Sequence, residues 1–148
     1  MGGHPYWYLV PYRDDAQAAL DELREREFRA GRYNPVLPFI DYSEDALFSQ
    51  KPGPEHASIE EAVEAAEQDG TRSILDIRTI AEMPEYGAAA PMDRAELQLL
   101  LGTDKPTREM LLASHELFAG IERGQCVYVT VYRDGRPSEF FFAGYSYD

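Results

Sequence analysis

A histidine followed directly by a glutamate, His115-Glu116, is the closest approach in this sequence to a metal-dependent catalytic motif. The helix of a zinc protease carries a second histidine four residues after the first, so that both imidazoles reach one metal ion. That position holds Ala119, and the other histidines, His4 and His56, are remote in the sequence. The single cysteine cannot supply a pair of thiolate ligands. We therefore predict neither a metal ion nor a cofactor.

The candidate nucleophiles are Cys126 and Ser146. A nucleophilic thiol needs a base or a positive environment beside it, and the sequence around Cys126 supplies neither. Gly144-Tyr145-Ser146 resembles the start of a nucleophile elbow, but the closing glycine and the following helix are missing. No catalytic residue is assigned. The sequence favours a non-enzymatic protein, while the question of activity stays open.

Glu27 is the carboxylate with the most unusual expected environment. The inner face of a helix predicted over residues 14–30 is otherwise built from alanine and leucine, and Glu27 lies in the middle of it. Such a carboxylate must reach solvent or bind a donor such as an arginine, and it is also the best candidate for a functional acid. A small-molecule pocket would lie where the loops 41–57 and 81–91 meet the sheet. Its candidate lining residues are Glu27, Arg32, Tyr33 and Asp76.

A row of carboxylates lies along the outer face of the helix predicted over residues 58–70. No lysine or arginine stands four residues after any of them to neutralise the row. The row consists of Glu60, Glu61, Glu64 and Glu67. The whole chain has 27 acidic and 14 basic residues, a net charge of −13. Such a charge repels nucleic acid and anionic lipid and favours cationic partners. We expect the row to be either a solvated helix face or a docking stripe for a basic protein.

Aromatic residues define a second candidate interaction surface. Asp134-Gly135 is typical of a type I′ turn, which would place Tyr128 opposite Phe141 and Val129 opposite Phe140. One sheet face would then carry four aromatic residues: Tyr128, Tyr132, Phe141 and Tyr145. Helices that cover this face would make it a core, and an exposed face would bind a partner or a second copy of the chain. We expect partial coverage.

The elements that hold these residues are predicted from hydrophobic periodicity, caps and turn residues. Strands are expected over residues 6–12, 73–78, 126–132 and 138–145, and helices over 14–30, 58–70, 93–101 and 107–121. The segments 41–57 and 81–91 should be irregular. This order predicts an α+β fold with a mostly antiparallel sheet of about four strands, a C-terminal β-hairpin and about four helices packed on the sheet. The length of 148 residues suits one acidic domain over 1–148.

Composition and local sequence also bear on location. The first residues lack the features of a signal peptide, and no apolar run approaches the roughly 18 residues of a membrane span, so we expect a cytoplasmic protein. Three segments, 29–35, 70–76 and 142–146, resemble a set of uncharacterised bacterial proteins. This resemblance implies a bacterial, cytosolic protein and brings no activity, cofactor or site.

Two functions remain from the sequence. The first is a non-enzymatic protein-interaction module, of an immunity or regulatory type, that binds a basic protein and neither nucleic acid nor membrane. Its support is the net charge, the carboxylate row and the absence of a catalytic motif. The alternative is a small-molecule-binding protein or an enzyme of unrecognised type that uses the pocket at the 41–57 and 81–91 loops.

Overall fold

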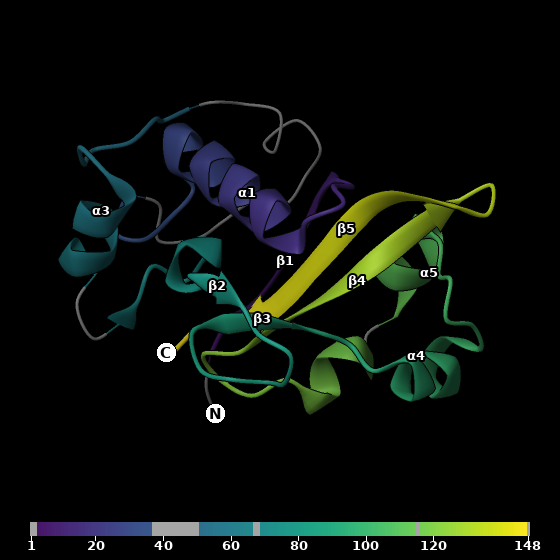
Figure 1. Ribbon diagram of the computed structural model, residues 1–148. Helices are drawn as coiled ribbons and strands as arrows, with labels where there is room; N and C mark the ends of the chain where they lie inside the picture. Colours follow the sequence, from purple (N-terminus) through teal and green to yellow (C-terminus); the bar gives the residue numbers. More distant parts are fainter. Residues whose placement is uncertain (1–2, 37–50, 67–68, 115, 148) are drawn as a thin grey trace.

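The computed structural model describes residues 3–36, 51–66, 69–114 and 116–147, and within these ranges the chain is α+β (Figure 1). The strands are β1 (Pro5–Pro11), β2 (Thr79–Ile80), β3 (Ala88–Pro91), β4 (Cys126–Arg133) and β5 (Arg136–Tyr145). The α-helices are α1 (Ala16–Ala30), α3 (Ile59–Ala65), α4 (Arg94–Leu101) and α5 (Arg108–Ala113). Two short 3₁₀ helices are η2 (Ile74–Asp76) and η3 (Glu116–Gly120).

The strands form one mixed sheet in the order β1-β5-β4-β3-β2. The pairs β1/β5 and β4/β5 are antiparallel, whereas β2/β3 and β3/β4 are parallel. The α+β class is confirmed, but the sheet has five strands and is less antiparallel than predicted. The additional strand β3 consists mainly of Ala88, Ala89 and Ala90, all buried. Alanine is depleted in strands, so its sequence predicted an irregular segment, and packing between β2 and β4 overrides that preference.

The strand predicted over residues 73–78 is wrong. Ile74–Asp76 forms the helical turn η2, and only Thr79–Ile80 pairs with the sheet. The hydroxyl of Ser73 accepts a hydrogen bond from the Leu75 amide at 3.2 Å and starts the turn. A short buried apolar run fits a strand or a buried turn equally well, so its hydrophobic pattern did not separate the two.

Helix α1 begins and ends where its sequence predicted. The Asp15 carboxylate accepts a hydrogen bond from the Gln17 amide at 3.0 Å. At the other end Gly31 adopts φ 72°, the left-handed conformation that commonly ends a helix. Helix α4 is also confirmed and ends at Gly102 with φ 76°. Asp93 is the N-cap residue of α4, but its side chain makes no capping hydrogen bond.

Two predicted helices are shorter in the structure. Helix α3 begins as predicted, with the Ser58 hydroxyl accepting from the Glu61 amide at 3.2 Å, but its last residue is Ala65. The helix expected over 107–121 is divided into α5 and η3, because Ser114 leaves the helical conformation at φ −95° and ψ 109°. Leu111 and Leu117 nevertheless pack in the same apolar cluster. His115 lies outside the described residues.

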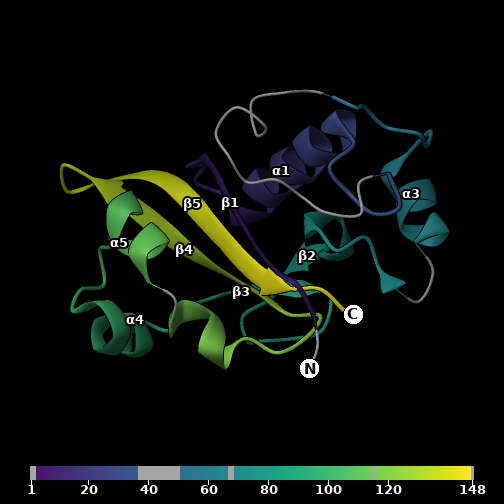
Figure 2. The same cartoon turned by 180° about the vertical axis from the view of Figure 1, so that it is seen from behind.

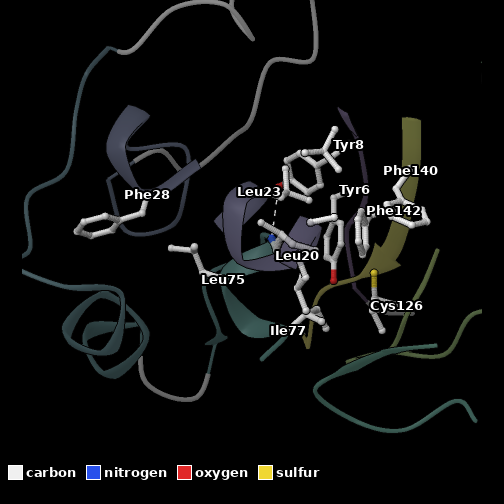
Figure 3. Close-up of a cluster of buried hydrophobic side chains, with 14 of the residues drawn as sticks. Tyr6, Tyr8, Leu20, Leu23, Phe28, Leu75, Ile77, Cys126, Phe140 and Phe142 are labelled. Atoms are coloured by element: carbon white, nitrogen blue, oxygen red, sulfur yellow. Dashed lines mark hydrogen bonds between the residues drawn. The ribbon is translucent and has the colours of Figure 1, made fainter. Parts of the chain in front are cut away.

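The sheet lies between two helical layers, as the views from the front and the back show (Figures 1 and 2). One face is covered by α1 and η2, against which α3 packs, and the opposite face packs against α4, α5 and η3. In the first cluster the side chains of Tyr6 and Phe142 point from the sheet toward Leu20 and Leu23 of α1 (Figure 3). Within the described ranges, no helix combines the length and the apolar character that crossing a membrane requires.

The hairpin of β4 and β5 has the predicted turn but not the predicted register. Asp134 and Gly135 adopt φ 53° and 77°, as a type I′ turn requires. A β-bulge then shifts the pairing between Val131 and Tyr132, so that Val131 faces Glu139 and Val129 faces Phe141 instead of Phe140. The bulge follows Pro137, which has no amide hydrogen for the ladder. A shift by one residue exchanges the two faces of one strand relative to the other.

Candidate binding clefts

Glu27 is fully buried, and its carboxylate is bound by arginine, which is one of the two outcomes that the sequence left open. Arg32 donates from Nε to Oε1 at 2.8 Å and from Nη2 to Oε2 at 2.7 Å. Arg26 adds a further bond from its Nε to Oε2 at 3.0 Å. The hydrogen bond with Glu27 raises the pKa of Arg32 further, although burial opposes it. These contacts hold the carboxylate in place between α1 and the chain that follows it.

The other two predicted pocket residues belong to separate networks. Tyr33 is buried, and its hydroxyl contacts Nδ1 of His56 at 2.7 Å. Asp76 Oδ1 accepts from the amide and the hydroxyl of Thr71 at 2.9 and 2.8 Å. The structure thus brings Glu27 and Arg32 together and places Tyr33 and Asp76 elsewhere. Residues 41–50 of the expected pocket lie outside the described residues, so that pocket stays a prediction.

Asp76 is a buried acid with one unsatisfied oxygen. Its Oδ2 has no hydrogen-bond partner in the described part of the chain, and it lies beside Gly70. Burial raises the pKa of Asp76, while the hydrogen bonds from Thr71 and from the Arg72 backbone and the charge of Arg24 oppose that shift. Tyr147 donates to the Asp76 carbonyl at 3.3 Å, and burial, together with Asp76 and Tyr86, raises the pKa of Tyr147 to about 12.

The predicted carboxylate row does not form one uniform stripe. Glu61 accepts a hydrogen bond from the Ala57 amide at 3.1 Å and so caps its own helix. Glu60 and Glu64 are exposed and line a cleft of about 560 Å³, opposite Arg24 and Arg78. We refer to this as the two-sign cleft. Glu67 lies outside the described residues. The row has no arginine in its own helix, but the tertiary fold places two arginines across from it.

The expected tyrosine-rich face is wrong, because the bulge in β5 divides its residues between the two sides of the sheet. Tyr128 packs with the cluster beneath α1, whereas Phe141 and Tyr145 pack with the cluster beneath α4 and α5. Tyr132 lies at the turn end of the sheet, with Lys105 Nζ 5.9 Å from the centre of its ring. Helical layers cover both faces, so the residues that the structure describes form no single exposed aromatic platform. A role of these residues in partner binding stays a prediction.

Cys126 is buried in the sheet, which argues against a role as a nucleophile. The residue is 1% exposed, and its thiol contacts the Val127 carbonyl oxygen at 3.5 Å. Burial raises the pKa of this thiol far above its ordinary value, so the reactive thiolate is strongly disfavoured at neutral pH. Among the described residues, no group of three or more histidine, cysteine, aspartate and glutamate side chains is placed to hold a metal ion.

A second cleft, which the sequence did not predict, opens between the segment 82–84, the start of α4 and η3. Its volume is about 650 Å³. The floor is apolar and includes Met92, Leu117 and Ile121 from the cluster beneath α4 and α5. Three exposed carboxylates line it: Glu82, Asp93 and Glu96. We refer to this as the acidic cleft.

The described lining of the acidic cleft is net negative, because Arg94 is the only basic residue among the described residues that line it. Glu96 reaches across from α4 toward η3, where its Oε1 lies 3.4 Å from the position a Cβ would take on Gly120. Met83 is 72% exposed at the same opening. The arrangement can therefore receive a group that is cationic at one end and aliphatic along its length. No local sequence signal marked this cleft, since its carboxylates come from separate elements.

A shallower apolar groove lies between α4 and α5. It is lined by Leu100, Leu101, Met110 and Ala113, with a volume of about 490 Å³. Leu99 beside it is 84% exposed.

Comparison of the chain with protein-family models, curated proteins and solved structures finds no match. The clefts themselves therefore carry the functional proposal.

Proposed function

We propose that this protein is an acidic interaction module that binds a cationic partner protein and receives basic side chains of that partner in the acidic cleft. The observation that carries the proposal is the combination of Glu82, Asp93 and Glu96 with an apolar floor. Lysine and arginine have aliphatic stems and charged ends, so they match both parts of this lining. The net charge of −13 would also accelerate encounter with a cationic surface.

The role we propose is non-enzymatic and of an immunity or regulatory type, in the cytoplasm. A module of this kind acts by occupying a cationic surface of its partner, such as the active site of a toxic enzyme or a nucleic-acid-binding surface. Carboxylates that occupy such a surface compete with phosphate groups for the same basic side chains. Support comes from the acidic field and from the cleft.

Affinity capture with matched charge variants tests the proposal. The bait is the whole chain, with Glu82→Lys/Glu96→Lys as the cleft variant and Glu60→Lys/Glu64→Lys as the control, since all four side chains are exposed. Each variant is first checked for wild-type circular dichroism and thermal stability. We expect wild type and control to retain a stoichiometric basic protein from a lysate of the source cells. The cleft variant should lose it, and higher salt should release it.

Retention of the same partner by the cleft variant would contradict the assignment of the site. Loss in the control alone would instead assign binding to the carboxylate row of α3 that the sequence suggested. A folded wild-type bait that retains no basic protein at low or moderate salt would remove the interaction proposal itself.

One observation supports the alternative function, a small-molecule-binding protein or an enzyme of unrecognised type. The acidic cleft lies at the predicted 81–91 loop and has a volume in the range of ligand pockets. Its lining differs from the residues expected there. If capture fails, a thermal-shift screen of small cationic molecules against wild type and the cleft variant would follow.

A further inference from the structure

The two-sign cleft has walls of opposite charge. Arg24 from α1 and Arg78 from the segment between η2 and β2 form the cationic wall. Glu60 and Glu64, four residues apart and therefore on the same side of α3, form the anionic wall. Ile59 and Val63 line the cleft beside them and are part of the margin of the apolar core.

Among the described residues the charged groups of the two walls form no direct ion pair, although the charge of Glu60 acts on Arg24. Within the described residues, no ion pair of 4.0 Å or less involves Arg24, Arg78, Glu60 or Glu64. Arg24 is partly fixed, because its Nη2 donates to the Leu75 carbonyl at 2.9 Å. Its Nε is buried and has no hydrogen-bond partner in the described part of the chain. A buried donor without a partner is costly.

The charge pattern selects one class of ligand. A simple anion would be repelled by Glu60 and Glu64, and a simple cation would be repelled by Arg24 and Arg78. A molecule that carries both charges a few bonds apart can satisfy both walls. The volume of about 560 Å³ suits a small molecule. The apolar residues Ile59 and Val63 would contact an aliphatic group.

We propose that the two-sign cleft binds a zwitterionic α-amino acid with an aliphatic side chain. Its carboxylate would face Arg24 and Arg78, its ammonium group would face Glu60 and Glu64, and its side chain would pack on Ile59 and Val63. This site is separate from the acidic cleft, and its residues come from the opposite side of the sheet. The inference therefore goes beyond partner binding and does not depend on it.

Calorimetry with aliphatic amino acids and two blocked analogues tests this site. The ligands are alanine, valine, leucine and isoleucine, compared with N-acetylleucine, which lacks the ammonium charge, and leucinamide, which lacks the carboxylate. We expect saturable binding of at least one free amino acid at millimolar concentrations or below. Each analogue of leucine should bind about tenfold more weakly or worse than leucine, since each removes a charge-assisted contact.

Variants at the exposed ends of the cleft connect binding to these residues. Arg78→Gln and Glu64→Gln remove one charge from each wall, and both side chains are exposed, so the fold should be retained. Each should weaken amino-acid binding about tenfold. The matched controls Arg136→Gln and Glu122→Gln, at exposed positions outside the cleft, should leave it unchanged. The proposal is overturned if none of the four amino acids binds, if either blocked analogue binds as well as leucine, or if the cleft variants bind like wild type.

Discussion

Arg32 holds Glu27 through two parallel hydrogen bonds, at 2.8 and 2.7 Å, in a place where the two residues are only 3% and 0% exposed. The same two residues are also joined through the backbone, where the Arg32 amide donates a hydrogen bond to the Glu27 carbonyl oxygen at 3.0 Å. The pair therefore fixes the chain reversal at Gly31, directly after α1. A carboxylate engaged in this way is a structural group, and its burial inside an alanine and leucine face is explained by its partner.

Glu27→Gln should destabilise the fold strongly. The substitution keeps the shape of the side chain but leaves the buried Arg32 charge without its counter-charge, a change that typically costs about 3–5 kcal/mol. Urea unfolding measures the loss. Glu22→Gln removes the partner of Arg13 in an exposed ion pair and should cost at most about 1 kcal/mol. Equal effects of the two substitutions would contradict a structural role for the buried pair.

Two glycines of the hairpin should respond differently to alanine. Gly135 has φ 77° with open space around it, so Gly135→Ala should cost only backbone strain of about 1–2 kcal/mol. Gly144 lies against the sheet core, where a Cβ would be 2.6 Å from Tyr6 Oη and 2.7 Å from the Gln125 carbonyl oxygen. Gly144→Ala should therefore lose more stability, about 3 kcal/mol. Thermal unfolding of both variants would show the order, and the reverse order would refute this packing.

Asp76 should stabilise the folded protein more in mild acid than at neutral pH. Its pKa is raised in the folded state, so the folded chain keeps this proton at a pH where the unfolded chain has lost it. The stabilisation from Asp76 is therefore complete below about pH 4, the ordinary pKa of an aspartate, and is lost as the pH rises through the folded pKa. Asp76→Asn cannot ionise. The difference in Tm, wild type minus variant, should fall as the pH rises through this window. A difference in Tm that stays constant or grows would contradict a buried Asp76 whose pKa is raised in the folded state.

The stabilisation that Tyr147 contributes should also be lost as the pH rises, but in the alkaline range. Its folded pKa of about 12 lies above the ordinary value of 10.0, so its contribution to stability is complete below about pH 10 and is lost as the pH rises toward 12. Tyr147→Phe should flatten this part of the stability profile without abolishing it, because burial also raises the pKa of Tyr33 and Tyr128. Thermal unfolding across this range measures the slope, and an unchanged slope in the variant would count against this environment for Tyr147.

The sequence predicted the elements whose signals are local. The helix starts at Ala16, Ile59 and Arg108 and the turn at Asp134-Gly135 each depend on residues within a few positions. The three helices begin within two residues of their predicted starts, and the turn lies where expected. The buried environment of Glu27 followed from helical periodicity alone. Its partner type was also predictable, because a buried carboxylate requires a donor.

The features that the sequence missed depend on contacts between distant segments. The strand Ala88–Pro91 exists because β2 and β4 flank it, and alanine has no local tendency to form it. The β-bulge adds a single residue to β5 near Pro137, so Phe141 lies on the sheet face opposite to that of Tyr128. The predicted aromatic surface therefore does not form. The acidic cleft could not be read from the sequence, because Glu82 and Glu96 lie on segments that only the fold brings together.

Carboxylate footprinting of the captured complex tests the central claim most directly. Carbodiimide-mediated labelling followed by peptide mass spectrometry reports the accessibility of each acid, with and without the basic partner. We predict that labelling of Glu82, Asp93 and Glu96 decreases in the complex, while that of Glu109 and Asp134, which lie outside the cleft and are exposed, does not change. Equal labelling of the three cleft carboxylates in the free and bound protein would contradict the acidic cleft as the partner-binding site.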